Sequence, residues 1–223
     1  MKKIQIKPVV STLLYLPLIT VIILIGLYPL QFILLKGKPG ILSMKSDGLL
    51  SNVMWNVGFY IHILLGGLAL LIGWVQFNKG FRQRNASIHR TIGKIYVASV
   101  LLSSLAGLYI GFFAEGGPVA FAGFTCGNLI WFYSTISAYS TILEGALWEH
   151  QKMMIFSYAT CLSAVTLRIW LPLLANATEN FILSYQLISW ISWAPNLVVA
   201  YFIVKWMEHR TAPDNFTNNT LYR

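Results

Sequence analysis

Six long apolar runs, separated by short polar segments, dominate the hydrophobic pattern of the chain. Each run is about 20 residues long, which is the length that an α-helix needs to cross the hydrocarbon core of a bilayer. The runs cover approximately residues 13–35, 57–77, 95–113, 119–143, 153–174 and 181–207. This pattern predicts an all-α polytopic membrane protein with six transmembrane helices.

The positive charges predict how these helices are oriented. The segment Gln76–Tyr96, between the second and third runs, carries five Lys and Arg residues. With this segment and both termini in the cytoplasm, twelve of the 16 Lys and Arg residues lie inside, three lie outside, and Arg168 lies within a span. Lys and Arg accumulate in the cytoplasmic loops of membrane proteins. We therefore expect a multi-pass protein of the cytoplasmic (inner) membrane with both termini cytoplasmic.

The composition excludes an ordinary soluble protein. Of the 223 residues, 57% are hydrophobic and 10% are charged, which is far from the average of soluble domains. The formal charge of +9 would suit nucleic acid, but the basic residues stand at the ends of apolar runs and not along one soluble face. The predicted partner is therefore the lipid bilayer and not nucleic acid. The sequence has no hydrolase, nucleotide-binding or zinc motif, so whether the protein is an enzyme stays open.

We interpret residues 1–223 as a single integral membrane domain. Residues 1–52 supply an uncleaved first span and a polar outer connection, and residues 208–223 form a cytoplasmic tail. Cys126 and Cys161 fall inside apolar runs at different depths, so no disulfide is expected. Pro195 is expected to kink the sixth helix.

Small residues recur at helical spacing on three of the runs. On the second run, His62, Gly66, Ala69 and Gly73 follow one another at steps of three or four and share a face. The third and fifth runs carry similar faces, and small residues let helix backbones approach closely in lipid. We predict a four-helix core made of spans two to five. Spans one and six are expected at its periphery, since the first has no such face.

Two ionisable side chains lie inside apolar runs. By helix counting, His62 and Arg168 stand at a similar depth in the outer third of the membrane, where an ionisable residue usually marks a functional site. They are expected to face a common cavity in which Arg168 binds an anionic group. The alternative is that Arg168 extends outward or pairs with a loop carboxylate, Glu115 or Glu179.

Histidines also stand ahead of two spans on the cytoplasmic side. The combined pattern is His62, Gln76, His89-Arg90-x-x-Gly93-Lys94-x-Tyr96, His150-x-x-Met153-Met154 and Arg168. This pattern resembles a family of bacterial predicted membrane proteins of unknown function, over about residues 60–174. That family carries no activity to transfer.

A four-helix core with histidines near helix ends is also distantly similar to the b-type cytochrome and ferric-reductase membrane superfamily. That resemblance implies one haem b with His89 and His150 as axial ligands, Gly93 giving clearance, and Arg90 or Lys152 pairing with the propionates. It further implies electron transfer with a redox partner or quinone. The chain departs from that superfamily because no span carries two histidines and the outer side carries one. No metal beyond a haem iron is predicted.

Three functions stay open at this point. The first is a small haem-binding electron-transfer protein. The second is a transporter or small-ligand binder whose outer cavity is lined by His62, Arg168 and Asn128, with Asn196 as a further candidate. The third is a structural or assembly factor without a ligand, in which the two mid-span asparagines serve as hydrogen-bonding groups between helices.

Overall fold

A computed structural model describes residues 6–35 and 37–211 of the chain. The basic start (residues 1–5), Lys36 and the polar tail (residues 212–223) lie outside the described residues. Within the described part every regular element is helical, and six helical segments are long and apolar enough to cross a membrane. The prediction of an all-α polytopic membrane protein is confirmed.

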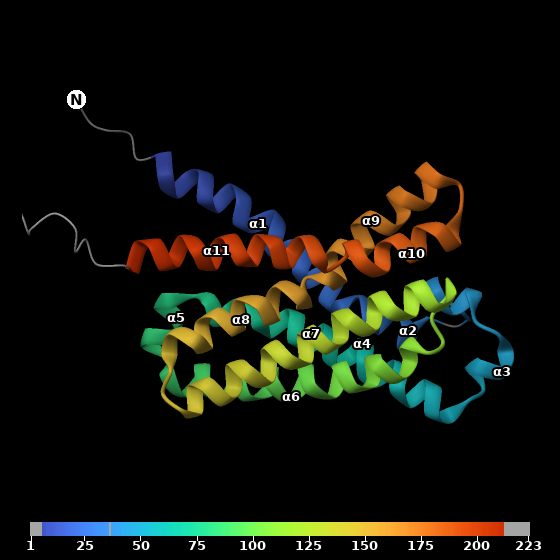
Figure 1. Ribbon diagram of the computed structural model, residues 1–223, viewed down its shortest axis with the longest axis horizontal. Helices are drawn as coiled ribbons and strands as arrows, with labels where there is room; N and C mark the ends of the chain where they lie inside the picture. Colours follow the sequence, from blue (N-terminus) through green and yellow to red (C-terminus); the bar gives the residue numbers. More distant parts are fainter. Residues whose placement is uncertain (1–5, 36, 212–223) are drawn as a thin grey trace, which may run out of the picture.

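The helices follow the predicted runs, with some extended at their ends (Figure 1). The third span begins nine residues earlier than predicted, at Ala86, because the helix continues through the basic segment. The elements, in order, are α1 (Ile6–Leu27), η1 (Tyr28–Leu30), α2 (Gln31–Leu34), η2 (Gly40–Met44), α3 (Asp47–Leu50), α4 (Val53–Gly73), η3 (Trp74–Phe77), α5 (Lys79–Arg84), α6 (Ala86–Gly111), α7 (Gly117–Leu143), α8 (Leu147–Cys161), α9 (Ser163–Thr178), α10 (Phe181–Ile191) and α11 (Ala194–Thr211).

Asparagine side chains cap the N-termini of three of these helices. Asn52 caps α4, Asn78 caps α5 and Asn180 caps α10, in each case by accepting a hydrogen bond from a backbone N–H of the first turn at 2.9–3.0 Å. Such caps satisfy backbone donors that have no partner within the helix. The caps on α4 and α10 fix the first residues of these two helices, which begin at the same end of the molecule.

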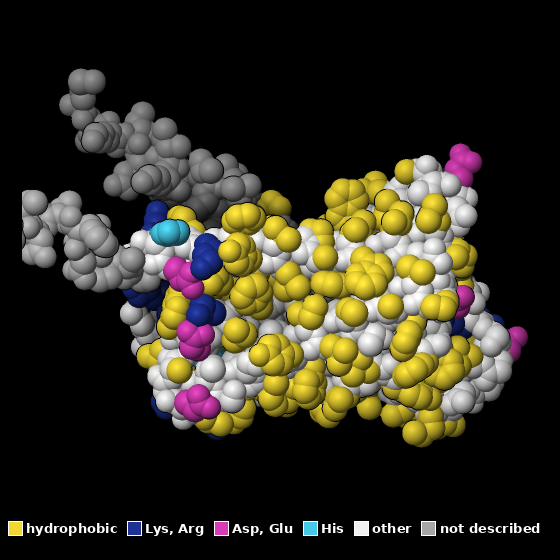
Figure 2. Space-filling view, in the orientation of Figure 1, with side chains coloured by type: hydrophobic (Ala, Val, Ile, Leu, Met, Phe, Trp, Pro, Cys, Tyr) yellow, Lys and Arg dark blue, Asp and Glu magenta, His cyan; other side chains and the backbone are white. Residues whose placement is uncertain are grey.

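Charged side chains gather at the two ends of the molecule, and hydrophobic side chains cover the surface between them (Figure 2). We call the end formed by residues 79–90 and 144–152 the basic end. The opposite end, formed by residues 37–52, 112–118 and 177–180, is called the far end. The apolar band between them is the surface expected to face lipid.

Helices α4, α6, α7 and α8 form the four-helix core. In this ring α4 packs on α6, α6 on α7 and α7 on α8, and α8 returns to α4. The first span packs outside it, with α1 against α4 and α9, and the sixth span does so too, with α10 against α7 and α9 and α11 against α8. The arrangement matches the predicted core with spans one and six at its periphery.

Buried hydroxyl groups join three helices in the middle of the core. The hydroxyl of Tyr96 on α6 lies 2.8 Å from Ser157 Oγ on α8, which lies 2.6 Å from Thr135 Oγ1 on α7. Thr135 in turn donates to the Trp131 carbonyl oxygen at 2.7 Å. Gly73 makes room for this cluster, because a Cβ at that position would lie 2.9 Å from the Tyr96 ring. The predicted small-residue faces thus point inward.

The fifth and sixth spans are each broken at mid-length. The sixth breaks at residues 192–193, just before Pro195, as expected from its sequence. The fifth breaks at Leu162, which was not predicted because no Pro or Gly stands there. Thr160 and Thr166, on either side, donate to carbonyl oxygens one turn back at 2.9 and 3.2 Å, and such bonds bend helices.

The two breaks lie side by side. Thr166 Oγ1 also lies within hydrogen-bonding distance of the Ser192 carbonyl oxygen, and Asn196 Nδ2 lies 3.1–3.2 Å from Ala159 O, Thr166 Oγ1 and Ser192 O. Asn196 therefore joins helices, which agrees with the hydrogen-bonding alternative. Beyond the breaks α9 leans away from α7, and α10 packs on both (Figure 1). This divergence opens space in the half of the bundle that leads to the far end.

Candidate functional site

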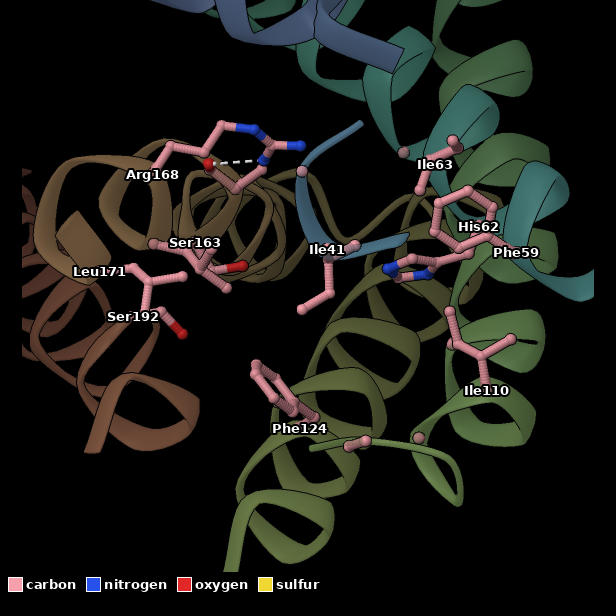
Figure 3. A pocket seen from close by; sticks show the side chains of 18 of the residues that line it. Ile41, Phe59, His62, Ile63, Ile110, Phe124, Ser163, Arg168, Leu171 and Ser192 are labelled. Atoms are coloured by element: carbon pink, nitrogen blue, oxygen red, sulfur yellow. Dashed lines mark hydrogen bonds between the residues drawn. The ribbon is translucent and has the colours of Figure 1, made fainter. Parts of the chain in front are cut away.

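A cavity of about 650 Å³ occupies this space. Its walls come from α4, α6 and α7 on one side and from α9 and α10 on the other (Figure 3). The volume falls within the range of small-molecule sites in proteins. His62, Arg168 and Asn128, which the sequence placed in one outer cavity, all line this one; that they bind a ligand there stays a prediction.

Arg168 enters the cavity from α9 without an ion pair. Its Nη1 donates to the Ala164 carbonyl oxygen at 2.9 Å, and its guanidinium carbon lies 4.3 Å from the centre of the Tyr28 ring. The buried Nε has no hydrogen-bond partner among the described residues, and none of their carboxylates pairs with this side chain. Nε and Nη2 form the guanidinium edge that binds a carboxylate through two parallel hydrogen bonds. That edge is free.

The two carboxylates considered as partners of Arg168 do not pair with it. Glu115 lies 2.8 Å from Lys45 Nζ, and Lys45 also donates to the Phe113 carbonyl oxygen at the far end. Glu179 is exposed after the last turn of α9, where its φ is 52°. The alternative that a loop carboxylate neutralises Arg168 is therefore wrong for the described chain.

His62 faces Arg168 across the cavity (Figure 3). Its Nδ1 lies 2.9 Å from the Ser103 carbonyl oxygen on α6, and Ser103 Oγ donates to the His62 carbonyl oxygen at 2.8 Å. This pair of contacts fixes the ring against α6. The partner of the other ring nitrogen, Nε2, is not found among the described residues, which leaves Nε2 for the cavity.

The side chains of Asn128 and His62 both approach Gly107, which has no side chain of its own. A Cβ placed on Gly107 would lie 2.4 Å from Asn128 Oδ1 and 2.7 Å from His62 Nδ1, closer than real Cβ contacts. Asn128 Nδ2 donates to the Phe124 carbonyl oxygen at 2.9 Å, one turn back on α7. Gly107 thus makes room for two polar side chains of the cavity.

Several cavity residues were missed by sequence reasoning. Tyr28 comes from η1 of the first span, and Ile41 from η2 points into the cavity (Figure 3). Ser163 and Ser192, beside the two helix breaks, also line it. The first span and the connection after it carry no periodic small-residue face, so their sequence gives no signal of this contact.

The histidines proposed for haem lie at the basic end, away from this cavity. His150 Nδ1 lies 2.7 Å from the Ala138 carbonyl oxygen, and the buried His89 Nδ1 has no partner among the described residues. The two rings are close enough to interact electrostatically. The space above Gly93 is bordered by Gln76, whose Oε1 would lie 3.9 Å from a Cβ there.

None of these basic-end residues lines the cavity, and neither does Arg90. Haem ligation by His89 and His150 therefore stays a prediction from the sequence. Among the described residues, no group of three or more His, Cys, Asp or Glu side chains could hold a metal ion.

The fold and this cavity define a class: a multi-pass helical membrane protein with a polar–apolar cavity buried in one half of its bundle. A family described as "Predicted membrane protein (DUF2306)" matches residues 59–204. The chain belongs to this family, as its histidine and arginine pattern suggested. The similarity to cytochromes is not shown. Searches of curated proteins and of solved structures found no match.

Proposed function

We propose that the protein binds a small anionic molecule with an apolar body in this cavity, as a ligand-binding or transport protein of the cytoplasmic membrane. The observation that carries the proposal is the buried Nε of Arg168, which has no partner among the described residues and stands in a cavity lined mainly by apolar side chains. A buried donor without a partner costs about 1–3 kcal/mol, and more when the group is charged. An anion that occupies the free guanidinium edge removes that cost.

The setting of Arg168 supports this reading over a purely structural one. A structural arginine in a membrane is expected to pair with a carboxylate or to use its donors on backbone oxygens. Here one nitrogen uses the Ala164 carbonyl oxygen, and the Tyr28 ring covers one face of the guanidinium. These contacts hold the cation in place, and the edge with two donors stays unused.

We propose further that the cavity is on the outer side of the membrane. The basic end carries five of the twelve described Lys and Arg residues and the far end carries two, and cytoplasmic loops are rich in these residues. Of the lysines at the far end, Lys38 and Lys45 each pair with a carboxylate, Asp47 and Glu115. This pairing reduces the positive charge that would otherwise oppose the orientation.

We prefer ligand binding to haem-linked electron transfer because the cavity lies beside Arg168 and His62 and not beside the basic-end histidines. A transporter and a binding protein share the same site. They differ in whether the ligand leaves on the other side.

The test measures thermal unfolding of the purified protein in detergent with three eight-carbon probes: octanoate, octanesulfonate and octanamide. A ligand at ten times its Kd stabilises the folded state by about 1.4 kcal/mol, which corresponds to roughly 3–5 °C for a chain of this length. We expect both anions to raise the melting temperature and the neutral amide to leave it unchanged. Equal shifts from all three probes would show unspecific binding and overturn the proposal.

Arg168→Leu should remove the anion effect, because two charge-assisted hydrogen bonds are worth at least about 100-fold in affinity. The matched control is Arg210→Leu. Arg210 also stacks on an aromatic ring, with its guanidinium carbon 3.9 Å from the Trp206 ring centre, but it is outside the cavity. That control should keep the full anion effect. If Arg168→Leu does not fold, Arg168→Gln decides: a folded Arg168→Gln protein that keeps the full anion effect would show that Arg168 does not bind the anion, and the proposal fails.

A further inference from the structure

We infer that the ligand of this cavity carries a neutral hydrogen-bond donor, a hydroxyl group, at the end opposite its anionic group. This inference rests on the proposed function and names the class of ligand: a hydroxy acid with an apolar middle. It follows from the protonation pattern of the two polar groups that face Arg168.

The first group is the His62 imidazole. A backbone carbonyl oxygen can only accept a hydrogen bond, so the 2.9 Å contact with the Ser103 carbonyl oxygen places the proton on Nδ1. A second positive charge across the cavity from the Arg168 guanidinium would be unfavourable in a buried site, so the ring is neutral. Its Nε2 is then a lone-pair acceptor directed into the cavity (Figure 3).

The second group is the Asn128 amide. Its Nδ2 donates to the Phe124 carbonyl oxygen at 2.9 Å, and that carbonyl cannot donate in return. The oxygen Oδ1 is thus identified without ambiguity. The hydrogen-bond partner of Oδ1 is absent from the described residues, and Asn128 lines the cavity. Because Asn128 Oδ1 and His62 Nδ1 both approach Gly107, the two side chains that carry the acceptors are neighbours.

The space between this acceptor pair and Arg168 is apolar. The side chains that surround it include Ile41, Phe59, Ile63, Ile110, Phe124 and Leu171 (Figure 3). A ligand with an anionic group alone would leave the acceptors unpaired after excluding water from them, which costs binding energy. A site with buried groups for a ligand hydroxyl discriminates strongly against the analogue without it.

A cationic donor such as an ammonium group does not suit this cavity. The Arg168 charge is unpaired, and the other cation of the cavity wall, Lys45, is already neutralised by Glu115 at 2.8 Å. No free carboxylate is therefore available among the described cavity residues to offset an ammonium group. A hydroxyl donates its one proton to one of these acceptors without adding positive charge.

The experiment compares 8-hydroxyoctanoate, octanoate and 8-methoxyoctanoate, by isothermal titration of the full-length protein in nanodiscs. The three share the carboxylate and the chain, but only the first has a terminal donor. We expect 8-hydroxyoctanoate to bind at least about 10-fold more tightly than the other two, the equivalent of one buried hydrogen bond. Equal affinities of 8-hydroxyoctanoate and octanoate would overturn this inference while leaving the proposed anion site intact. If none of the three binds, the proposed function itself fails.

Two variants assign the preference to the acceptors. His62→Phe keeps a ring of similar size, and Asn128→Leu keeps a side chain of similar shape. Because the hydroxyl donates its one proton to one of the two acceptors, at least one variant should reduce the preference for the hydroxy acid to less than about threefold, measured as the ratio of the two affinities within that variant. Should both variants fold, as judged by size-exclusion chromatography, and keep the tenfold preference, the acceptors lie elsewhere and the inference is wrong. If one variant does not fold, the preference of the other decides.

Discussion

Replacing Gly107 by alanine tests the geometry of the cavity wall most directly. The new Cβ would lie 2.4 Å from Asn128 Oδ1 and 2.7 Å from His62 Nδ1. Both side chains would have to retreat by about 1 Å to reach ordinary van der Waals contact. His62 cannot retreat without stretching its 2.9 Å contact with the Ser103 carbonyl oxygen. The substitution therefore affects packing and a buried hydrogen bond together.

The expected change in the free energy of unfolding is the sum of opposing contributions. Overpacking of a buried site costs about 1–3 kcal/mol, and weakening the His62 hydrogen bond adds about 1 kcal/mol. Replacing glycine by alanine within a helix returns about 1 kcal/mol. We expect Gly107→Ala to lower the free energy of unfolding by about 1–3 kcal/mol.

Gly111→Ala is the matched control, because Gly111 lies one turn farther along α6 and also lines the cavity. A Cβ there would approach no closer than 3.8 Å to Thr125 Oγ1 and 3.9 Å to the Phe121 ring. This variant should keep wild-type stability or gain up to about 1 kcal/mol. The two variants should therefore differ by about 1–4 kcal/mol.

The assay is unfolding in mixed micelles of dodecyl maltoside and SDS, followed by far-UV circular dichroism, with octanoate titrations on the same preparations. Gly107→Ala should also bind octanoate more weakly than Gly111→Ala, since its cavity wall has moved. Equal stability of the two variants, together with equal octanoate affinity, would refute the described placement of His62 and Asn128.

Three further predictions concern other parts of the molecule. Glu115→Gln leaves the buried Lys45 ammonium without a carboxylate and should destabilise the protein by about 3 kcal/mol. Asp47→Asn breaks an exposed ion pair and should have little effect in the same unfolding assay. Similar losses of stability from the two variants would contradict this prediction. Tyr96→Phe removes one hydroxyl from the buried chain between α6, α7 and α8, and urea or SDS unfolding should show a loss of about 1 kcal/mol; an unchanged midpoint would show that this hydroxyl does not hold the helices together. A single cysteine at position 85, in a variant without the two native cysteines, should resist an impermeant maleimide in intact cells and react after lysis; labelling from outside would reverse the orientation.

The spans and the main polar residues of the cavity could be predicted from the sequence because both depend on local rules. Apolar runs of spanning length have few alternatives to a membrane helix. His62 and Arg168 could be placed at one depth because rise per residue converts position into height. Their small-residue faces then turned both side chains toward the inside of the bundle. The sequence also suggested the alternative for Asn196 that its contacts favour.

Other features escaped prediction because they depend on contacts between distant segments. The cation–π contact of Tyr28 with Arg168 joins the first and fifth spans. A contact between residues so far apart in the chain leaves no periodic pattern in the sequence. The pairing of Glu115 with Lys45 was missed for the same reason, since both residues lie in loops. The break at Leu162 arises from threonine side chains that bond to the backbone, and these residues are also common in unbroken membrane helices.

The paired breaks in the fifth and sixth spans set the mechanics of the cavity. Thr166 and Asn196 join the two spans at the level where each helix is interrupted, so α9 and α10 share one bending axis. At 1.5 Å per residue, the 16 residues of α9 make a lever about 24 Å long. A rotation of about 5° at the breaks would displace the far tip of that lever by about 2 Å, roughly half the width of an alkyl chain. A small change of angle at the two breaks would thus change the volume of the cavity, whose wall at the breaks includes Ser163 and Ser192.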